Sequence, residues 1–307
     1  MKTKHLLATG LLALTLTFVA DQPVLAAAFV PGEILIPDYG HSVWGYSADG
    51  TLLQTYTSTG SAVSQTALTP EGNLVTGFLV PGHYGLNITN PNGTVITSFA
   101  ATGVQVNGDV SVFPDGTLAL VDQFSNNVQF RSPTGVLLQT VSLPGLANAY
   151  GTTVGADGLL YVTAIDSRNM ARVNAAGTWL GNISLGFQPG DVVMNPRDGT
   201  LWFSGYGNGQ VMHSRTDGTL LGSFPTGFIT AFSGIGLAPD NNSVFVAALN
   251  GPVKHFDLSG HLLGSFPLPG PNGGSVFLTV VPNPTPEPGC AALLGLGALL
   301  LAARRRA

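Results

Sequence analysis

The sequence predicts an all-β protein in which one small sheet is repeated around a ring, and three observations predict it. The first is the number of turn formers, 41 Gly and 21 Pro among 307 residues, because both residue types open tight turns. The second is a charged fraction of 9%, against about 25% in an ordinary soluble domain, which argues against helical bundles and coiled coils. The third is an internal repeat.

Two series of turns define the repeat. The glycines of the first series stand at positions 50, 93, 135, 177, 218 and 260, with spacings of 43, 42, 42, 41 and 42 residues. The second series lies between them and reads Pro70-Glu71-Gly72, Pro114-Asp115-Gly116, Ala156-Asp157-Gly158, Arg197-Asp198-Gly199 and Pro239-Asp240-Asn241. Asp-Gly and Asn-Gly allow the positive φ angles of tight hairpins. Two hairpins in each unit give four antiparallel strands, so each unit is predicted to be one blade of a β-propeller.

The two ends of the repeated region predict how the ring closes. The first unit begins directly at Ile34-Leu35-Ile36 and lacks an inner strand. After the last complete unit, which ends near Phe266, one strand remains over residues 275–281. We expect this strand to complete the first blade, which leaves no open seam. The prediction is therefore a six-bladed propeller over residues 29–283.

Two stretches of this region resemble a known kind of repeat. Residues 190–202 with 208–211, and residues 113–122 with 126–130, are similar to the repeats of NHL and gluconolactonase-like (SMP-30-like) propellers. The resemblance covers about residues 30–283. It implies the six-bladed fold but no particular activity, because one fold carries many functions.

The N-terminal residues 1–28 have the pattern of a secretory signal peptide, which we expect to be helical. A basic start, Met1 to His5, precedes an uncharged apolar stretch, Leu6 to Ala20, and the small residues of Val24-Leu25-Ala26-Ala27-Ala28 follow. This order is typical of a signal that is removed on export, here after Ala26 or Ala28. The alternative is a retained anchor helix, for which the apolar stretch is short.

Residues 284–307 form a second targeting segment. Pro286-Glu287-Pro288 is followed by an apolar run, Cys290 to Ala303, and by Arg304-Arg305-Arg306. These three ordered parts resemble the PEP-CTERM sorting signal of Gram-negative bacteria. The resemblance implies a short hydrophobic helix, an exosortase-type sorting enzyme as partner, and a role with exopolysaccharide or biofilm. A plain C-terminal membrane anchor is the alternative, and either interpretation places the propeller in the periplasm, at the cell surface or outside the cell.

Charge and cysteine content exclude several classes of function. Residues 29–283 contain 14 acidic and 6 basic side chains, a net charge of −8, so a nucleic-acid partner is not expected. The single cysteine, Cys290, lies in the C-terminal segment. An intramolecular disulfide framework and a thiolate zinc site are therefore excluded.

Candidate ligand-binding residues come from the loops that we expect at one end of the central channel. These loops enter the inner strands or join the second and third strands of a blade. The candidates are Asp38, Tyr39, His41, His83, Tyr84, Asp109, Asp122, Tyr150, Asp166, Arg168, Asp191 and Tyr206. The expected starts of the inner strands are Ser64-Gln65, Gly108-Asp109, Tyr150-Gly151, Gly190-Asp191, Ser233-Gly234 and Gly273-Gly274.

The resemblance to gluconolactonases also implies a divalent metal held by a Glu, an Asn and an Asp at inner-strand starts. A cation such as calcium needs several converging oxygen ligands. Here Asp109, Asn148 and Asp191 are the candidates, and no Glu lies on an inner strand. No other cofactor is expected.

Structural roles compete with each of these interpretations. Acids that precede Gly form hairpins, and Asp122 and Asp166 occupy what reads as a repeated position after a strand, where Asx turns form. Aromatic residues near His41 and His83 suit stacking on sugars but also suit packing. We therefore expect a non-catalytic binding or scaffold module that recognises envelope polysaccharide or protein. The alternative is a metal-dependent, gluconolactonase-like lactonase.

Overall fold

The computed structural model describes residues 29–38, 40, 42–57, 64–80, 83–104, 107–228, 233–248, 251–268 and 277–283. The predicted signal peptide, the predicted C-terminal sorting segment and the two helices expected in them lie outside the described residues, as do Tyr39 and His41. Among the described residues there is no helix long and apolar enough to cross a bilayer.

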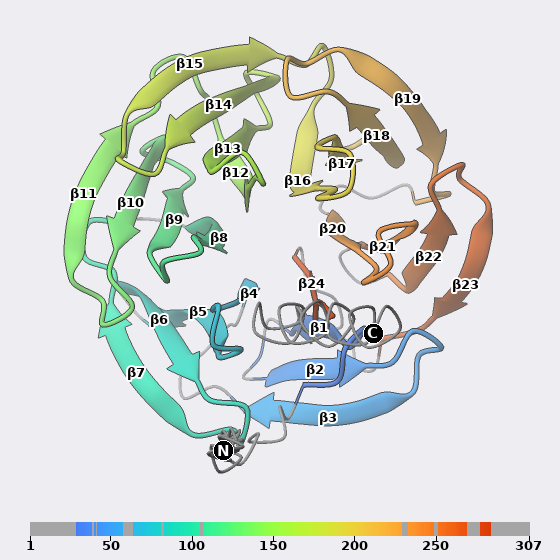
Figure 1. Cartoon of the computed structure of the whole chain (residues 1–307), viewed down its shortest axis with the longest axis horizontal. Helices are drawn as coiled ribbons and strands as arrows, with labels where there is room; N and C mark the ends of the chain where they lie inside the picture. The colour runs from blue at the N-terminus through green and yellow to red at the C-terminus, as the bar shows by residue number, and fades with distance from the viewer. Residues whose placement is uncertain are drawn as a thin grey trace, which may run out of the picture.

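The six predicted blades are present, and each is a four-stranded antiparallel sheet (Figure 1). The innermost strands are β24 (Thr279–Val280), β4 (Thr66–Leu68), β8 (Asn107–Val112), β12 (Ala149–Val154), β16 (Pro189–Met194) and β20 (Ser233–Leu237). The second strands are β1 (Ile34–Pro37), β5 (Leu74–Val80), β9 (Leu118–Asp122), β13 (Leu159–Ala164), β17 (Leu201–Gly205) and β21 (Ser243–Ala248). The third are β2 (Ser42–Tyr46), β6 (His83–Thr89), β10 (Asn127–Arg131), β14 (Asn169–Asn174), β18 (Gln210–Ser214) and β22 (Val253–Asp257). The outermost are β3 (Leu52–Thr57), β7 (Val95–Ala100), β11 (Leu137–Ser142), β15 (Trp179–Ser184), β19 (Leu220–Pro225) and β23 (Leu262–Phe266).

Ring closure is as predicted. β24 pairs antiparallel with β1, with Thr279 opposite Leu35 and Val280 opposite Ile34. Thr279 also donates its hydroxyl to the carbonyl of Thr66 in the next blade, at 2.6 Å. The last and first segments of the domain therefore share one sheet, which hides a seam that would otherwise expose strand edges.

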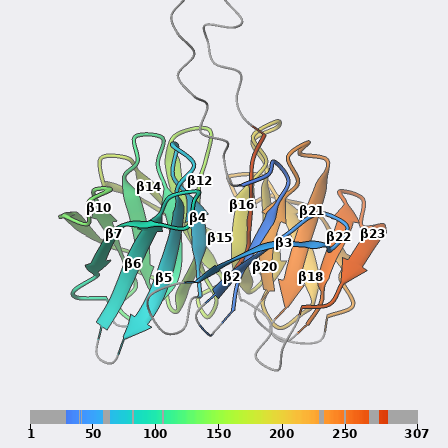
Figure 2. The ribbon, with the colours of Figure 1, turned by 90° about the horizontal axis from the view of Figure 1, so that it is seen from below.

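The two ends of the disc differ, and Figure 2 shows the strands running between them. One end, here called the turn face, carries both Gly-containing turns of every blade; the other, the loop face, carries the connections between second and third strands and between blades. Positive φ angles occur at Gly50, Gly116, Gly158 and their counterparts, as the hairpin interpretation requires. Residues 29–33 and 281–283 lie together on the turn face, since the Gly32 amide donates to Val281 and the Val281 amide to Glu33.

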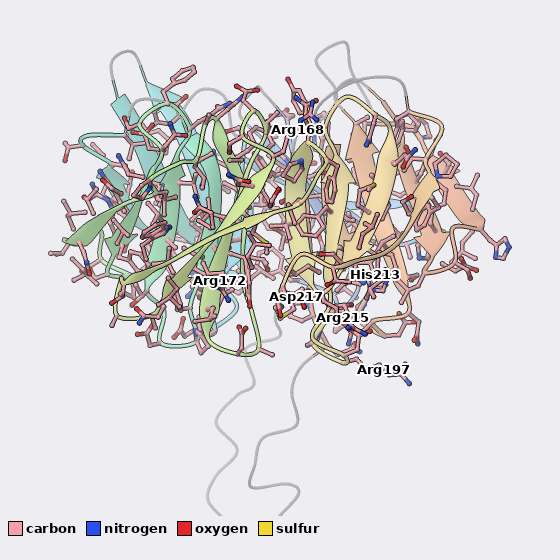
Figure 3. All side chains as sticks on the ribbon, turned by 90° about the horizontal axis from the view of Figure 1, so that it is seen from above. Arg168, Arg172, Arg197, His213, Arg215 and Asp217 are labelled. Carbon is pink, nitrogen blue, oxygen red and sulfur yellow. The ribbon has the colours of Figure 1, made fainter. Side chains whose placement is uncertain are left out.

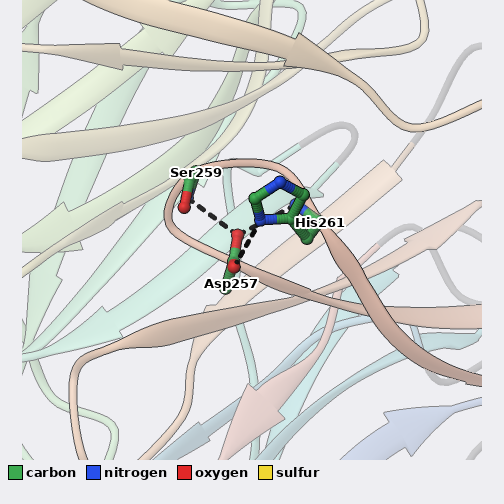
Figure 4. A network of polar contacts seen from close by, with 3 residues as sticks. All are labelled: Asp257, Ser259 and His261. Carbon is green, nitrogen blue, oxygen red and sulfur yellow. Dashed lines mark hydrogen bonds and ion pairs between the residues drawn. The ribbon is translucent and has the colours of Figure 1, made fainter.

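Acidic residues stabilise these turns. The Asp115 carboxylate accepts a hydrogen bond from the Thr117 amide at 2.9 Å, and Asp157, Asp198 and Asp217 act in the same way. In the last blade Asp257 accepts from the amides of Ser259 and His261 and pairs with the His261 ring at 2.9 Å (Figure 4). These bonds hold the pKa of Asp257 down to about 2. The predicted role of such acids as hairpin formers is confirmed for this set.

Hydrophobic side chains fill the spaces between neighbouring blades. One cluster joins Val128 and Phe130 of the third blade to Leu160 and Val162 of the fourth, and comparable clusters lie around the ring. Because the second strand of each blade is buried on both faces, these strands have little room for charge. This explains the low charged fraction of the sequence.

Candidate functional site: the central channel

The inner strands bring one residue from each blade to the same level of the channel. Their pairing registers align six residues that follow one another around the ring: Gln65, Asp109, Gly151, Asp191, Gly234 and Phe277. Five of the expected inner-strand starts are therefore correct. The sixth is wrong, because the register puts Phe277, and not the Gly273-Gly274 pair, at this level.

The two acidic residues of this level reach across to the next blade. Asp109 accepts hydrogen bonds from its neighbour Val110 at 2.8 Å and from the Thr152 amide of the fourth blade at 3.2 Å. Asp191 repeats the arrangement with the Val192 amide at 2.7 Å and the Ile235 amide of the sixth blade at 3.0 Å. These carboxyls thus satisfy amides on the free edges of inner strands, which have no further strand to pair with.

Small residues at the intervening positions let the inner strands approach closely. A Cβ atom on Gly151 would lie 2.6 Å from the Cα of Asp191 and 2.7 Å from the carbonyl oxygen of Gly190. A Cβ atom on Gly234 would lie 2.8 Å from the amide nitrogen of Leu278. From the third to the sixth blade, Asp109 and Asp191 therefore alternate with Gly151 and Gly234, whose lack of a side chain lets neighbouring inner strands approach closely.

Burial controls the protonation of the acidic pair. Burial raises the pKa of Asp109 well above its ordinary value, and the negative charge of Asp191 raises it further. Burial raises the pKa of Asp191 to about 8, although its two backbone hydrogen bonds act in the opposite direction. Both shifts favour the protonated form of these carboxyls, which presents an O–H donor as well as acceptors.

A cavity of about 310 Å³ lies beside this pair. Its polar wall consists of Asp109, Asp191 and five hydroxyl residues, namely Thr66, Ser111, Thr152, Thr153 and Thr279. Toward the turn face it adjoins a second, mainly apolar hollow of about 500 Å³, with which it shares Leu68, Val112, Val154, Met194 and Pro196. The channel thus leads from the acidic pair toward the turn face.

Two aromatic rings lie across the channel at the other end of this cavity. Tyr150 of the fourth blade and Phe277 of the first, on opposite sides of the ring, are in contact, with ring centroids 4.9 Å apart and ring planes tilted by 31°. Both residues are buried, and the half-buried Tyr206 packs against them. The hollow therefore opens at the end of the disc opposite to the one that the sequence suggested.

The predicted loop-face residues separate into three groups. Asp38 and Asp122 form Asx turns: Asp38 accepts from the amides of Gly40 and Ser42, and Asp122 from those of Phe124 and Ser125. Asp166 and Arg168 are exposed on the loop between β13 and β14, and Figure 3 shows Arg168 at the opposite end of the disc from Arg197 and Arg215. Tyr84, Tyr150 and Tyr206 pack against neighbouring apolar side chains.

One expected equivalence is wrong. Asp122 is the last residue of β9 and pairs with Asn127, whereas the matching residue of β13 is Ala164, paired with Asn169. Asp166 lies two residues farther along, in the loop. The backbone register, and not the residue type, therefore defines the equivalent position. The strand β6 begins at His83, whose side chain is outside the described set.

The proposed metal ligands do not converge in the described part of the chain. Asn148 is absent from the cavity wall, and its side-chain oxygen accepts a hydrogen bond from Gln123 at 2.6 Å. No group of three or more His, Cys, Asp or Glu side chains suited to a metal occurs among the described residues. Two carboxyls already bonded to backbone amides fall short of the six to eight oxygens that calcium takes, so the described residues do not fit a calcium centre.

Several residues of the cavity escaped prediction. The hydroxyls of Thr66, Ser111, Thr152 and Thr153 read as ordinary strand residues, and Phe277 lies in a strand whose register the sequence does not reveal. The available signal was the spacing itself: counting from Asp109 by one repeat places Gly151, Asp191 and Gly234 at one level. The same spacing, applied to hydroxyl residues, would have placed Thr66 and Thr152 at one common level of the channel.

Comparison with solved structures finds the same fold in very different sequences. A chain from the structure of a nidogen/laminin complex has 13% identity and a TM-score of 0.67, with 81% of this chain and 98% of that chain covered. A functionally unknown protein from Desulfotomaculum acetoxidans gives 15% identity and a TM-score of 0.62, with coverages of 82% and 86%. Virginiamycin B lyase from Staphylococcus aureus gives 18% identity and a TM-score of 0.55, with coverages of 68% and 71%.

No protein-family model matches the sequence, and no curated protein matches it. At identities of 13–18%, the solved structures establish the architecture only, because one fold carries many activities. The comparisons therefore support an all-β, six-bladed propeller of the kind found in NHL-like proteins and lyases.

Proposed function

We propose that this chain is a non-catalytic binding module that holds an uncharged, hydroxyl-rich ligand, such as the end of an envelope polysaccharide, in its central channel. The observation that carries the proposal is the environment of Asp109 and Asp191. Both are buried and bonded to backbone amides, and burial raises the pKa of each and so favours its neutral form. A neutral carboxyl beside Thr and Ser hydroxyls can exchange hydrogen bonds with sugar hydroxyls, whereas a cation gains little from it.

Export is the second part of the proposal. The signal-peptide pattern of residues 1–28 and the PEP-CTERM-like residues 284–307 support delivery across the inner membrane and sorting by an exosortase-type enzyme. The placement of residues 29 and 283 on one face is compatible with a domain attached through that face. Expression in a Gram-negative host, followed by mass measurement of the mature chain, tests both cleavages; a cytoplasmic, unprocessed chain would exclude export.

Binding can be tested with one variant and one matched control. Thr153 lines the cavity and lies in an inner strand, whereas Thr140 is exposed in the outer strand β11. Glycan arrays with the full chain should identify a saccharide ligand, and Thr153→Phe should weaken its binding at least tenfold while Thr140→Phe leaves it unchanged. Absence of binding to any envelope component, or equal effects of the two variants, would exclude the channel as the site.

The lactonase alternative predicts different results in the same preparation. It requires a bound divalent ion, which raises the unfolding temperature by mass action, and it requires turnover of a lactone. We expect neither from this chain. A calcium-dependent shift together with lactone hydrolysis would replace the binding proposal with the enzymatic one.

A further inference from the structure

The apolar hollow on the turn face has no occupant among the described residues. Its volume of about 500 Å³ falls in the range of roughly 300–1,000 Å³ that is typical of ligand sites. Four of the six blades contribute to its wall, with Leu68 and Pro70, Val112 to Pro114, Val154 to Ala156, and Met194 with Pro196. Such a recess in water favours an apolar partner.

The path of the chain brings its own C-terminal segment to this hollow. Pro282 is itself part of the wall, and Asn283, where the described chain stops, donates its side-chain amide to the carbonyl of Pro239 at 3.2 Å. The next 24 residues include the uncharged apolar run Cys290 to Ala303. The six intervening residues can reach roughly 20 Å when extended, enough to bring the run back over the opening.

Charge around the opening matches the end of the same segment. Each inner turn places an exposed acidic residue within two residues of the wall: Glu71, Asp115, Asp157, Asp198 and Asp240. One cation, Arg197, lies among them and donates to Asn242. The segment ends in Arg304-Arg305-Arg306, so an apolar recess with a mainly acidic rim faces an apolar run followed by three cations.

We propose that the hollow on the turn face is the docking site of the chain's own residues 290–303, with Arg304 to Arg306 on the acidic rim. Docked there, the apolar run is shielded from water. This placement is independent of what the channel binds, and it applies to the full chain outside a membrane. A second copy of the protein and a lipid surface are the competing occupants.

The chain offers a direct test because Cys290 is its only cysteine. Ala156 is exposed and lines the hollow, whereas Ala147 is exposed at the other end of β12, on the loop face. In dilute, detergent-free solution, the full chain carrying Ala156→Cys should form an intramolecular disulfide with Cys290 at least tenfold faster under mild oxidation than the chain carrying Ala147→Cys. The measurement is the loss of two hydrogens from a monomeric chain by mass.

A second pair of variants separates docking from simple tethering. Leu293→Gln with Leu294→Gln keeps the tether but removes apolar surface, and it should slow disulfide formation in the Ala156→Cys chain at least threefold. Replacing the three terminal arginines by Glu should also slow it, through repulsion from the rim. Equal rates at positions 147 and 156, a rate unaffected by the Gln substitutions, or disulfide-linked dimers alone would overturn the proposal.

Discussion

The stability of this propeller should fall as the pH rises from 6.5 to 8, and Asp191 provides the reason. Its pKa is about 8 in the folded chain because of burial, against about 3.9 in an unfolded chain. The folded state therefore binds more protons than the unfolded state throughout this window. Since stability falls with pH wherever the folded state binds more protons, the linkage relation gives a loss of about 1.6 kcal/mol between pH 6.5 and 8 from this group alone.

The window limits opposing contributions, since above pH 6.5 each buried histidine offsets the fall by at most about 0.4 kcal/mol. Burial lowers the pKa of His213 and His255, so these residues make the protein more stable as the pH rises toward their unfolded value of about 6.5. Turn carboxylates such as Asp257, with a pKa of about 2, affect stability only in acid. Above pH 6.5 the channel pair should dominate the slope.

Urea unfolding of the wild type and Asp191→Asn at pH 6.5, 7.25 and 8 measures the effect. The variant lacks one of the two titrating carboxyls, so its free energy of unfolding should fall by about 1.6 kcal/mol less than that of the wild type over the window, whatever the constant effect of losing one hydrogen bond, while Asp109 still contributes its own slope. Asp166→Asn removes an exposed loop carboxylate and should keep the wild-type slope. A wild-type stability that is flat or rising between pH 6.5 and 8, or a slope retained in Asp191→Asn, would refute the protonated state on which the binding proposal rests.

Two further substitutions test how the ring is held together. Gly151→Ala should cost about 1–3 kcal/mol of unfolding free energy, because its Cβ would meet the backbone at Asp191 and a packed site resists added volume. The control Gly222→Ala places its Cβ more than 4 Å from any other atom and should change the unfolding free energy by no more than about 0.5 kcal/mol. Equal effects of the two variants in urea unfolding would contradict the close approach of the inner strands. Thr279→Val removes a hydroxyl bonded to Thr66 in the next blade and should cost about 1–3 kcal/mol, and an unchanged unfolding midpoint would show that this contact does not help to close the ring.

The fold was predictable because its signals are local. Each Asp-Gly turn sets a hairpin within a few residues, so Gly116, Gly158 and their counterparts mark the blade edges without reference to the rest of the chain. Closure was predictable because one strand was missing at the start and one was left over at the end. Both inferences need only turn chemistry and a count of strands.

The candidate site was only partly predictable, because it depends on register and on contacts across the ring. Asp109 and Asp191 are 82 positions apart in the sequence, and Asp191 raises the pKa of Asp109 only because their two inner strands face a common channel. The contact between the rings of Tyr150 and Phe277 likewise joins blades on opposite sides of the propeller. Residue types suggested Asn148 as their companion, but its side chain is directed to Gln123.

The contact between the Tyr150 and Phe277 rings determines from which end of the channel Asp109 and Asp191 are accessible. Tyr150 and Phe277 bound the cavity toward the loop face, and the wall continues through Val112, Val154 and Met194 to the turn face. A ligand that reaches Asp109 from the turn face must therefore pass the opening near Pro282, where the C-terminal segment leaves the domain.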